Sequence, residues 1–181
     1  MPAFRRVSTL SRRRATSSRN AVFERAGLTV RGARAAEAAA LTALCRRSKA
    51  HWGYDAAFMA MSAAGLTVSE DSITAGRVLV AEAHDGRVLG VAAVDPQGAI
   101  ADLDLLFVDP PAMGRGAGRA LFKASCALAR DGGARALTIL ADPNAAPFYE
   151  RMGARFVRNA PSDSIPGREL PFYVLVLEEA A

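Results

Sequence analysis

Residues 113–119 read Met-Gly-Arg-Gly-Ala-Gly-Arg and combine three glycines with two arginines between an apolar run and a helix-like stretch. The first N–H groups of a helix have no partner within the helix, and the helix dipole adds partial positive charge to them. Glycines let the main chain approach an anion because they carry no Cβ. The stretch therefore indicates a turn that binds a phosphate group, and a connector that binds nothing is the alternative.

Two nucleotide-binding fingerprints do not fit this turn. A P-loop requires G-x-x-x-x-G-K-[ST], whereas Gly118 is followed by Arg119 and Ala120. A dinucleotide-binding turn requires G-x-G-x-x-G in the first turn of a parallel sheet, and residues 114–118 have the spacing G-x-G-x-G. The spacing therefore excludes both of these nucleotide sites.

Three side chains outside the turn could transfer protons. Asp102 and Asp104 alternate with leucines, so we expect both carboxylates on one face of a strand with apolar neighbours. Such neighbours raise the pKa of a carboxylate toward the range that suits a general base, although a solvated sheet face or a structural hydrogen bond would fit the same pattern. Tyr149 could donate a proton from its phenol, and a core aromatic beside Phe148 is the alternative.

The sequence holds few residues that bind metals. His51 and His84 are the only histidines, and Cys45 and Cys126 each lie in an apolar helical pattern. Their spacing is not that of a metal site, so we expect no metal. Two buried free thiols are typical of a cytoplasmic protein, which is our expectation for this chain.

Hydrophobic periodicity and turn signals predict the elements that position these residues. Three strand-like runs follow one another, and Asp85-Gly86 between the first two is a strong hairpin signal. Apolar runs of strand length then alternate with amphipathic stretches. The pattern predicts an α/β domain with a mixed, mostly antiparallel sheet and helices on both faces. The expected strands are 28–31, 77–83, 87–95, 100–109, 136–141, 154–158 and 171–178, and the expected helices are 33–47, 55–61, 116–130 and 145–152.

Two stretches of the chain resemble the acyl-CoA-binding segments of the GNAT superfamily of N-acyltransferases and occur in the same order. The first is LDLLFVDPPAMGRGAGRALF, whose turn resembles the pattern (Gln/Arg)-x-x-Gly-x-(Gly/Ala), and the second is ILADPNAAPFYERMGAR. Met113 departs from the pattern, which usually begins with Gln or Arg. The resemblance covers residues 28–178 and implies a GNAT-like fold, acetyl-CoA as cosubstrate and no metal.

The resemblance also implies which residues bind the cosubstrate. Main-chain N–H groups of the turn would hold the pyrophosphate, and the strand end at 106–108 would pair with the pantetheine arm, where the next strand diverges. Asn144 would bind the pantetheine amides, and a turn residue after Asp-Pro is its alternative reading. The implied set is Leu106, Phe107, Val108, Met113, Gly114, Arg115, Gly116, Ala117, Gly118, Arg119 and Asn144.

By the same resemblance the chain would be an N-acetyltransferase that moves an acetyl group to a primary amine of a small molecule or peptide by direct attack. Tyr149 would be the general acid and Asp102 the general base, with a water chain as the alternative to Asp102. Trp52 and Tyr54 would suit either a wall of the acceptor site or a hydrophobic plug over the sheet. A non-catalytic acyl-CoA-binding or regulatory module and a structural protein that reuses the fold are the alternative functions.

Charge divides the chain into two parts. Residues 1–26 carry seven arginines and one acid, a net charge of +6, whereas residues 27–181 carry 16 basic and 17 acidic side chains, a net charge of −1. We expect 1–26 to be a flexible leader and 27–181 to form the N-acetyltransferase domain. A transit peptide, a start site assigned too far upstream, and a nucleic-acid or membrane tether are alternatives for the leader.

The composition of the body limits its partners. A nearly neutral body is not expected to bind nucleic acid, and no apolar run approaches the ~20 residues of a membrane span. Strand 171–178, which we expect at an edge of the sheet, could support a homodimer.

Overall fold

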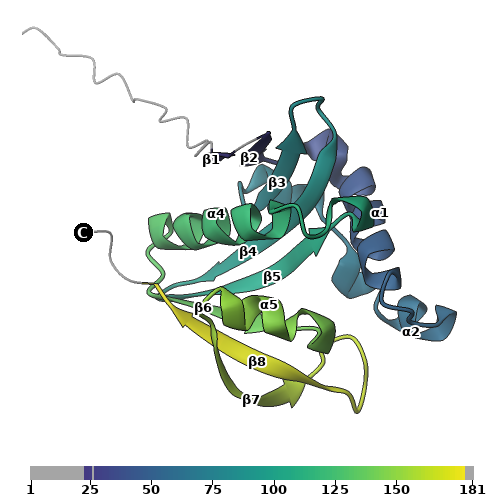
Figure 1. Cartoon of the computed structure of the whole chain (residues 1–181). Helices are drawn as coiled ribbons and strands as arrows, with labels where there is room; N and C mark the ends of the chain where they lie inside the picture. Colours follow the sequence, from purple (N-terminus) through teal and green to yellow (C-terminus); the bar gives the residue numbers. More distant parts are fainter. Residues whose placement is uncertain (1–22, 26, 178–181) are drawn as a thin grey trace, which may run out of the picture.

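The computed structural model describes residues 23–25 and 27–177 of the 181-residue chain. Its strands form one sheet in the order β1-β2-β3-β4-β5-β6-β8-β7, with helices on both faces (Figure 1). The strands are β1 (Phe23–Arg25), β2 (Leu28–Gly32), β3 (Val78–Ala83), β4 (Val88–Gln97), β5 (Ile100–Val108), β6 (Ala136–Leu140), β7 (Arg155–Pro161) and β8 (Glu169–Val176). The α-helices are α1 (Ala38–Ala50), α2 (Ala56–Met61), α3 (Glu70–Thr74), α4 (Ala117–Asp131) and α5 (Ala146–Arg151). The predicted mixed, mostly antiparallel α/β sheet is confirmed.

Local signals set the boundaries of the helices before the sheet. Asp55 caps α2, because its side chain accepts a hydrogen bond from the N–H of Phe58. Helix α1 continues to Ala50, three residues past the predicted end at 47. The five-residue helix α3 was not predicted, although Ser69 caps it in the same way as Asp55 caps α2.

Strands β3 to β5 form the antiparallel meander that the hairpin signals predict, and β2 pairs with β3 in antiparallel orientation. Gly86 adopts a φ of 81° in the turn between β3 and β4, a conformation that other residues rarely adopt. After β5, helix α4 carries the chain across one face of the sheet to β6, which pairs with β5 in parallel. The two kinds of connection produce the mixed sheet.

Strands β5 and β6 pair along only part of their length. Their register runs from Ile100 opposite Ala136 to Asp102 opposite Thr138, and β5 then continues to Val108 without β6 beside it. The other side of β5 remains paired with β4 as far as Val108. The divergence expected from the GNAT resemblance is therefore present, and it leaves one edge of β5 open inside the sheet.

A β-bulge lies at the start of this opening. Leu103 pairs with Val94 and Leu105 pairs with Ala93, so Asp104 is an extra residue on β5. The extra residue reverses the alternation of the strand, because Leu103 packs in the cluster under α4 whereas Leu105 packs in the cluster under α1. The simple alternation that we expected for Asp102 and Asp104 is therefore wrong beyond residue 103.

The two hydrophobic clusters hold the two layers of helices on the sheet. One joins α4 and α5 to residues such as Ala92, Leu103 and Ile139, and the other joins α1 to residues such as Val80 and Val91. The positions of the two sets alternate along β3 and β4, so the clusters lie on opposite faces. The helices thereby fix the position of the open edge of β5 relative to the start of α4.

The C-terminal strands correct one prediction. Strand β8 lies between β6 and β7, so the outer strand is β7, and the edge position expected for 171–178 is wrong. The chain first forms β7 at the edge and then returns as β8, which pairs with both β6 and β7. Strand propensity does not reveal this order. None of the helices in the described ranges is long and apolar enough to cross a membrane.

The predicted leader is only partly described. Strand β1 falls within 1–26 and pairs with β2, whereas residues 1–22 and 26 lie outside the described residues. The flexibility and the alternative roles expected of the leader remain predictions.

Candidate active site

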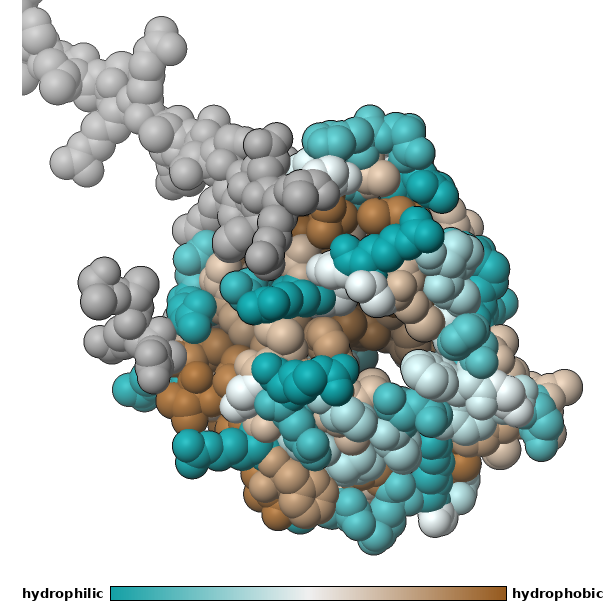
Figure 2. All heavy atoms as spheres, in the orientation of Figure 1, coloured by the Kyte–Doolittle hydropathy of each residue, from teal (hydrophilic) through white to brown (hydrophobic). Residues whose placement is uncertain are grey.

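A cavity of about 600 Å³ opens where β5 and β6 separate. Figure 2 shows this face of the molecule hollowed between its upper and lower parts. The cavity brings together most of the residues that the sequence analysis selected: Trp52, Asp102, Leu106, Phe107, Val108, Met113, Gly114, Gly116, Gly118, Arg119, Asn144 and Tyr149. Tyr54, Arg115 and Ala117 are not among its lining residues.

The glycine turn forms one end of this cavity. Gly114 and Gly116 have φ values of 75° and 93°, and Gly116 is the N-cap residue of α4. No described side chain caps the helix, and the first intrahelical bond of this turn runs from the N–H of Ala120 to the carbonyl of Gly116. The N–H groups of 117–119 therefore remain available to an anion at the N-terminus of the helix.

Gly118 differs from the two glycines before it, because its φ is not positive. A Cβ at this position would lie 3.4 Å from Val108 Cγ2 and 3.6 Å from Phe148 Cε2, which are ordinary van der Waals distances. The packing of α4 on β5 and α5 therefore does not require a glycine here. Of the other predicted residues in the turn, Ala117 is buried and offers only its main chain, and Arg115 lines a separate shallow pocket.

Replacing Gly116 by Ala is expected to lower the free energy of unfolding by about 1–2 kcal/mol, because an L side chain is strained at this positive φ. Urea denaturation measures the change. Arg115→Ala, an exposed position in the same turn, is the control and is expected to change stability by less than about 0.5 kcal/mol. Equal stability of Gly116→Ala and the wild type would show that the turn does not require this backbone conformation.

The open edge of β5 forms the long wall of the cavity. Leu106, Phe107 and Val108 pair with β4 on one side and have no strand partner among the described residues on the other. Main-chain groups along such an edge can hydrogen-bond an extended ligand in the way that a further strand would. The wall is therefore suited to a narrow ligand with amide groups.

A charged cluster at Asp142 closes the cavity at the end of β6. The Asp142 carboxylate accepts hydrogen bonds from Lys49 Nζ at 2.6 Å and Tyr54 Oη at 2.8 Å, and Arg168 lies 3.6 Å away. It also accepts a hydrogen bond from the N–H of Asn144 at 3.0 Å. Burial alone would raise the pKa of Asp142, but the hydrogen bonds and the charge of Lys49 hold it below its usual value.

No pattern in the sequence predicts Lys49, Asp142 and Arg168 as site residues. Lys49 and Asp142 are 93 residues apart in the chain, so no local pattern joins them. The Asp-Pro-Asn sequence at 142–144 was the one available signal, because Asp before Pro commonly caps a turn or helix.

The cluster also decides the orientation of two predicted residues. Asn144 Nδ2 lies 3.0 Å from Asp142 Oδ1 and 3.2 Å from Tyr54 Oη, so its amide has a fixed orientation at the cavity wall. Tyr54 stacks on Phe58 and links this cluster instead of lining the cavity. Trp52 lines the cavity and is 45% exposed, so it does not act as the hydrophobic plug.

Asp102 and Asp104 lie at the closed end of the β5 opening. Asp102 Oδ1 accepts a hydrogen bond from Thr138 Oγ1 at 2.7 Å, across the last residue pair of β5 and β6. Burial raises the pKa of Asp102, the Thr138 hydrogen bond opposes this, and the charges of Asp95 and Asp163 raise it further. The side chain of Asp104 is more exposed than that of Asp102, but the protein around it still raises its pKa, and the nearby carboxylates add to the effect.

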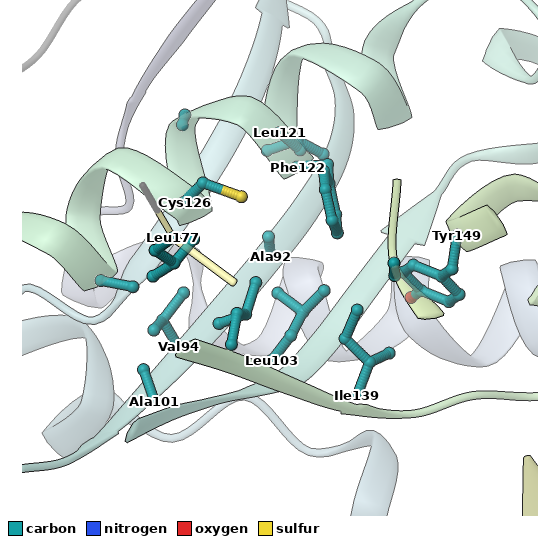
Figure 3. Packing of buried hydrophobic residues seen from close by; sticks show 14 of the residues in the cluster. Ala92, Val94, Ala101, Leu103, Leu121, Phe122, Cys126, Ile139, Tyr149 and Leu177 are labelled. Carbon is teal, nitrogen blue, oxygen red and sulfur yellow. The ribbon is translucent and has the colours of Figure 1, made fainter. Parts of the chain in front are cut away.

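Tyr149 lies in the wall opposite β5. Its side chain is only 6% exposed and packs beside Phe148 with ring centroids 5.2 Å apart. Figure 3 shows it at the border of the hydrophobic cluster, on the same side as Ile139. Its hydroxyl has no hydrogen-bond partner among the described residues, and burial raises its pKa well above its ordinary value. The phenol is therefore neutral at any working pH.

Comparison with known proteins identifies the kind of domain that has this geometry. Residues 53–163 match the family model described as the acetyltransferase (GNAT) domain. The matched region contains the glycine turn, both aspartates of β5, Asn144 and Tyr149. No curated protein matches the sequence.

Several solved structures share the fold. A GCN5-related N-acetyltransferase from Rhodopseudomonas palustris is 24% identical with a TM-score of 0.69, and the match covers 86% of this chain and 99% of that one. The yncA protein from Salmonella typhimurium, solved with acetyl-CoA, is 24% identical with a TM-score of 0.63 over 86% and 97% of the two chains. The PaiA N-acetyltransferase from Thermoplasma acidophilum, solved with coenzyme A, is 14% identical with a TM-score of 0.70 over 83% and 99%.

Proposed function

The chain belongs to the GNAT acetyltransferase family, and on this premise we propose that it transfers the acetyl group of acetyl-CoA to a primary amine of a small molecule or peptide by direct attack. One observation carries the proposal: the open edge of β5, the start of α4 and the unpaired hydroxyl of Tyr149 meet in a single cavity. An extended thioester whose far end carries phosphates requires these three features together.

The donor would lie along β5 with its phosphates at the glycine turn. The main chain of 106–108 would pair with the two amides of the pantetheine arm, and the oriented side chain of Asn144 would face them from the other wall. The N–H groups of 117–119 would bind the pyrophosphate, and the exposed side chain of Arg119 would add charge beside it. Met113 carries no charge, so the pyrophosphate would be bound mainly by the main-chain N–H groups.

Tyr149 would stabilise the sulfur as the C–S bond breaks. A thiol has an ordinary pKa of about 8.5 and a phenol about 10, and burial raises that of Tyr149 further. Proton transfer to a free thiolate is therefore unfavourable, so the phenol would donate its hydrogen bond and proton in step with cleavage. Its neutrality keeps the donor present at every working pH.

Asp102 would accept the proton of the attacking amine, directly or through water. A primary ammonium group has an ordinary pKa near 10.4, so a carboxylate with a raised pKa is a better acceptor than an ordinary one. The attack forms the N–C bond, breaks the C–S bond and leaves an amide and a thiol, and the proton on Asp102 would return through water to the phenolate of Tyr149 and restore both groups. The water-chain alternative stays open because water can bridge the amine and the carboxylate.

Replacing Thr138 by Val tests the role of Asp102. The change removes a hydrogen bond to the charged form of Asp102, so the pKa of Asp102 is expected to rise further. Because a base acts only when deprotonated, the acidic limb of the pH profile of kcat/KM is expected to move to higher pH with it. Thr29→Val, on the distant strand β2, is the control, and an unmoved limb in Thr138→Val would contradict the assignment.

Two measurements test the function itself. Acetyl-CoA at about 100 times its Kd is expected to stabilise the fold by about 2.7 kcal/mol, seen as a higher Tm. Thiol release from acetyl-CoA in the presence of a panel of primary amines then measures transfer. Stabilisation without thiol release for any amine would instead support the non-catalytic module, and the absence of both would support the structural alternative.

We propose a cytoplasmic location because Cys45 and Cys126 are buried free thiols. A homodimer remains a prediction, and β8 no longer offers the edge for it. The expectation that the body does not bind nucleic acid likewise remains a prediction.

A further inference from the structure

Three carboxylates line the closed end of the cavity without a basic partner. Asp102 and Asp104 come from β5, and Asp163 comes from the connection between β7 and β8. The fourth carboxylate of the cavity, Asp142, has Lys49 and Arg168 beside it, whereas no ion pair within the described ranges involves the other three. This end of the cavity therefore holds negative charge that the protein itself does not balance.

The three carboxylates are close enough to repel one another. The charge of Asp163 raises the pKa of both Asp102 and Asp104, and the charge of Asp102 raises that of Asp104. Like charges in one site favour either proton uptake or a bound cation. The repulsion is therefore relieved when a positively charged ligand enters.

A second observation points to a ligand in this cavity. Tyr149 is more than nine-tenths buried, lines the same cavity, and has a hydroxyl with no partner among the described residues. An unpaired polar group at this depth is costly unless a ligand or water completes its bonding. Burial, and then the charges of Asp142 and Asp102 in that order, raise the pKa of Tyr149, so the hydroxyl is close enough to feel Asp102 as well as the Asp142 cluster.

Four basic side chains line the cavity, and none of them forms an ion pair with the three carboxylates within the described ranges. Lys49 and Arg168 both bind Asp142, and their positions are fixed further by the rings of Tyr54 and Phe58. Arg119 lies at the glycine turn, six or more strand residues along β5 from Asp102, which is about 20 Å. Arg151 is exposed at the end of α5.

We propose that the acceptor is an aliphatic diamine or polyamine, of which one primary amine is acetylated while a second, still protonated amine binds Asp104 and Asp163. The inference rests on the proposed function. The attacking amine must be neutral and gives its proton to Asp102, so it cannot balance the other two carboxylates. Buried Leu66, Ile165 and Leu170 line the same cavity and offer an apolar surface for the methylene chain.

Three amines with the same four-carbon chain test the proposal. Putrescine carries a second ammonium at the far end, n-butylamine carries none, and 4-aminobutyrate carries a carboxylate there. With acetyl-CoA saturating, kcat/KM is expected to be highest for putrescine, about 10- to 100-fold above butylamine, and lowest for 4-aminobutyrate. Higher ionic strength is expected to reduce the ratio of kcat/KM for putrescine to that for butylamine.

Asp163→Asn and Asp104→Asn test the residues. Each is expected to lower the ratio of kcat/KM for putrescine to that for butylamine about tenfold or more. Asp131→Asn, at the far end of α4, makes the same change of charge away from the cavity and is expected to leave the ratio unchanged. The Tm of every variant is measured, and removal of a repelled carboxylate at 104 is expected to leave it equal or higher.

The outcomes separate this proposal from the proposed function. Equal or faster turnover of butylamine or 4-aminobutyrate overturns the diamine proposal while acetyl transfer stands. Stabilisation by acetyl-CoA without turnover of putrescine also overturns it. If acetyl-CoA neither raises the Tm nor releases thiol with any amine, the proposed function and this inference fail together.

Discussion

Tyr149→Phe is expected to lower kcat by about 100-fold or more and to change the Kd for acetyl-CoA by less than about twofold. The reason is that the change removes one hydroxyl from the cavity wall and leaves the packing of the ring against Phe148 in place. Single-turnover acetylation measures the chemical step, and the shift in Tm with acetyl-CoA measures binding. The basic limb of the pH profile is expected to stay where it is, because the phenol does not ionise in the working range.

Tyr173→Phe is the matched control for this experiment. Tyr173 is also buried in the cluster under α4, but its hydroxyl hydrogen-bonds Glu150 at 2.9 Å and it does not line the cavity. Its replacement is expected to leave kcat within about twofold. A kcat of Tyr149→Phe that equals that of Tyr173→Phe would refute the role of Tyr149 as the general acid.

Asp142→Asn is expected to produce the largest loss of stability, about 2–4 kcal/mol at neutral pH. The substitution leaves Lys49 and Arg168 without their shared carboxylate, and the side chains of all three are less than one-fifth exposed. It also removes an anchor of Asn144, so we expect weaker binding of acetyl-CoA. Urea denaturation and isothermal titration measure the two effects.

The pH dependence of this loss has a definite sign. The pKa of Asp142 is lowered in the fold, so its contribution is present above its ordinary value near 3.9 and disappears as the pH falls through the lowered value. The difference between wild type and Asp142→Asn is therefore expected to shrink below about pH 4. Asp95→Asn is the control, because its ion pair with Arg77 is exposed and is expected to contribute about 0–1 kcal/mol. A loss no larger than that of the control would contradict a structural role for Asp142.

Much of the cavity wall was predictable because its features are local. The glycine turn lies directly before a strongly amphipathic helix, and Asp85-Gly86 defines the hairpin that begins the meander. Once the order of strands is known, β5 must lead into the turn, so 106–108 and 113–119 fall on adjoining walls. The two motif segments also lie next to each other in the fold, as the resemblance implied.

The features that were missed depend on residues far apart in the chain. The bulge at Asp104 has no signature of its own, since the residue is a single polar position between two leucines. The Asp142 cluster joins α1, the end of β6 and the β7–β8 connection, so it exists only after these elements pack. Tyr54 was expected at the acceptor wall because it is aromatic, but its hydroxyl holds it to this cluster.

The short pairing of β5 with β6 has a mechanical consequence. In the part of the chain that the structure describes, only three strand residue pairs join β1–β5 to β6–β8, and the cavity lies directly beside this short junction. A ligand that hydrogen-bonds β5 on one wall and Asn144 on the other would link β1–β5 to β6–β8. Binding of acetyl-CoA would then stabilise the contact between the two parts of the sheet. The amides of β6 and β8 would exchange their hydrogens more slowly, although no ligand touches most of them.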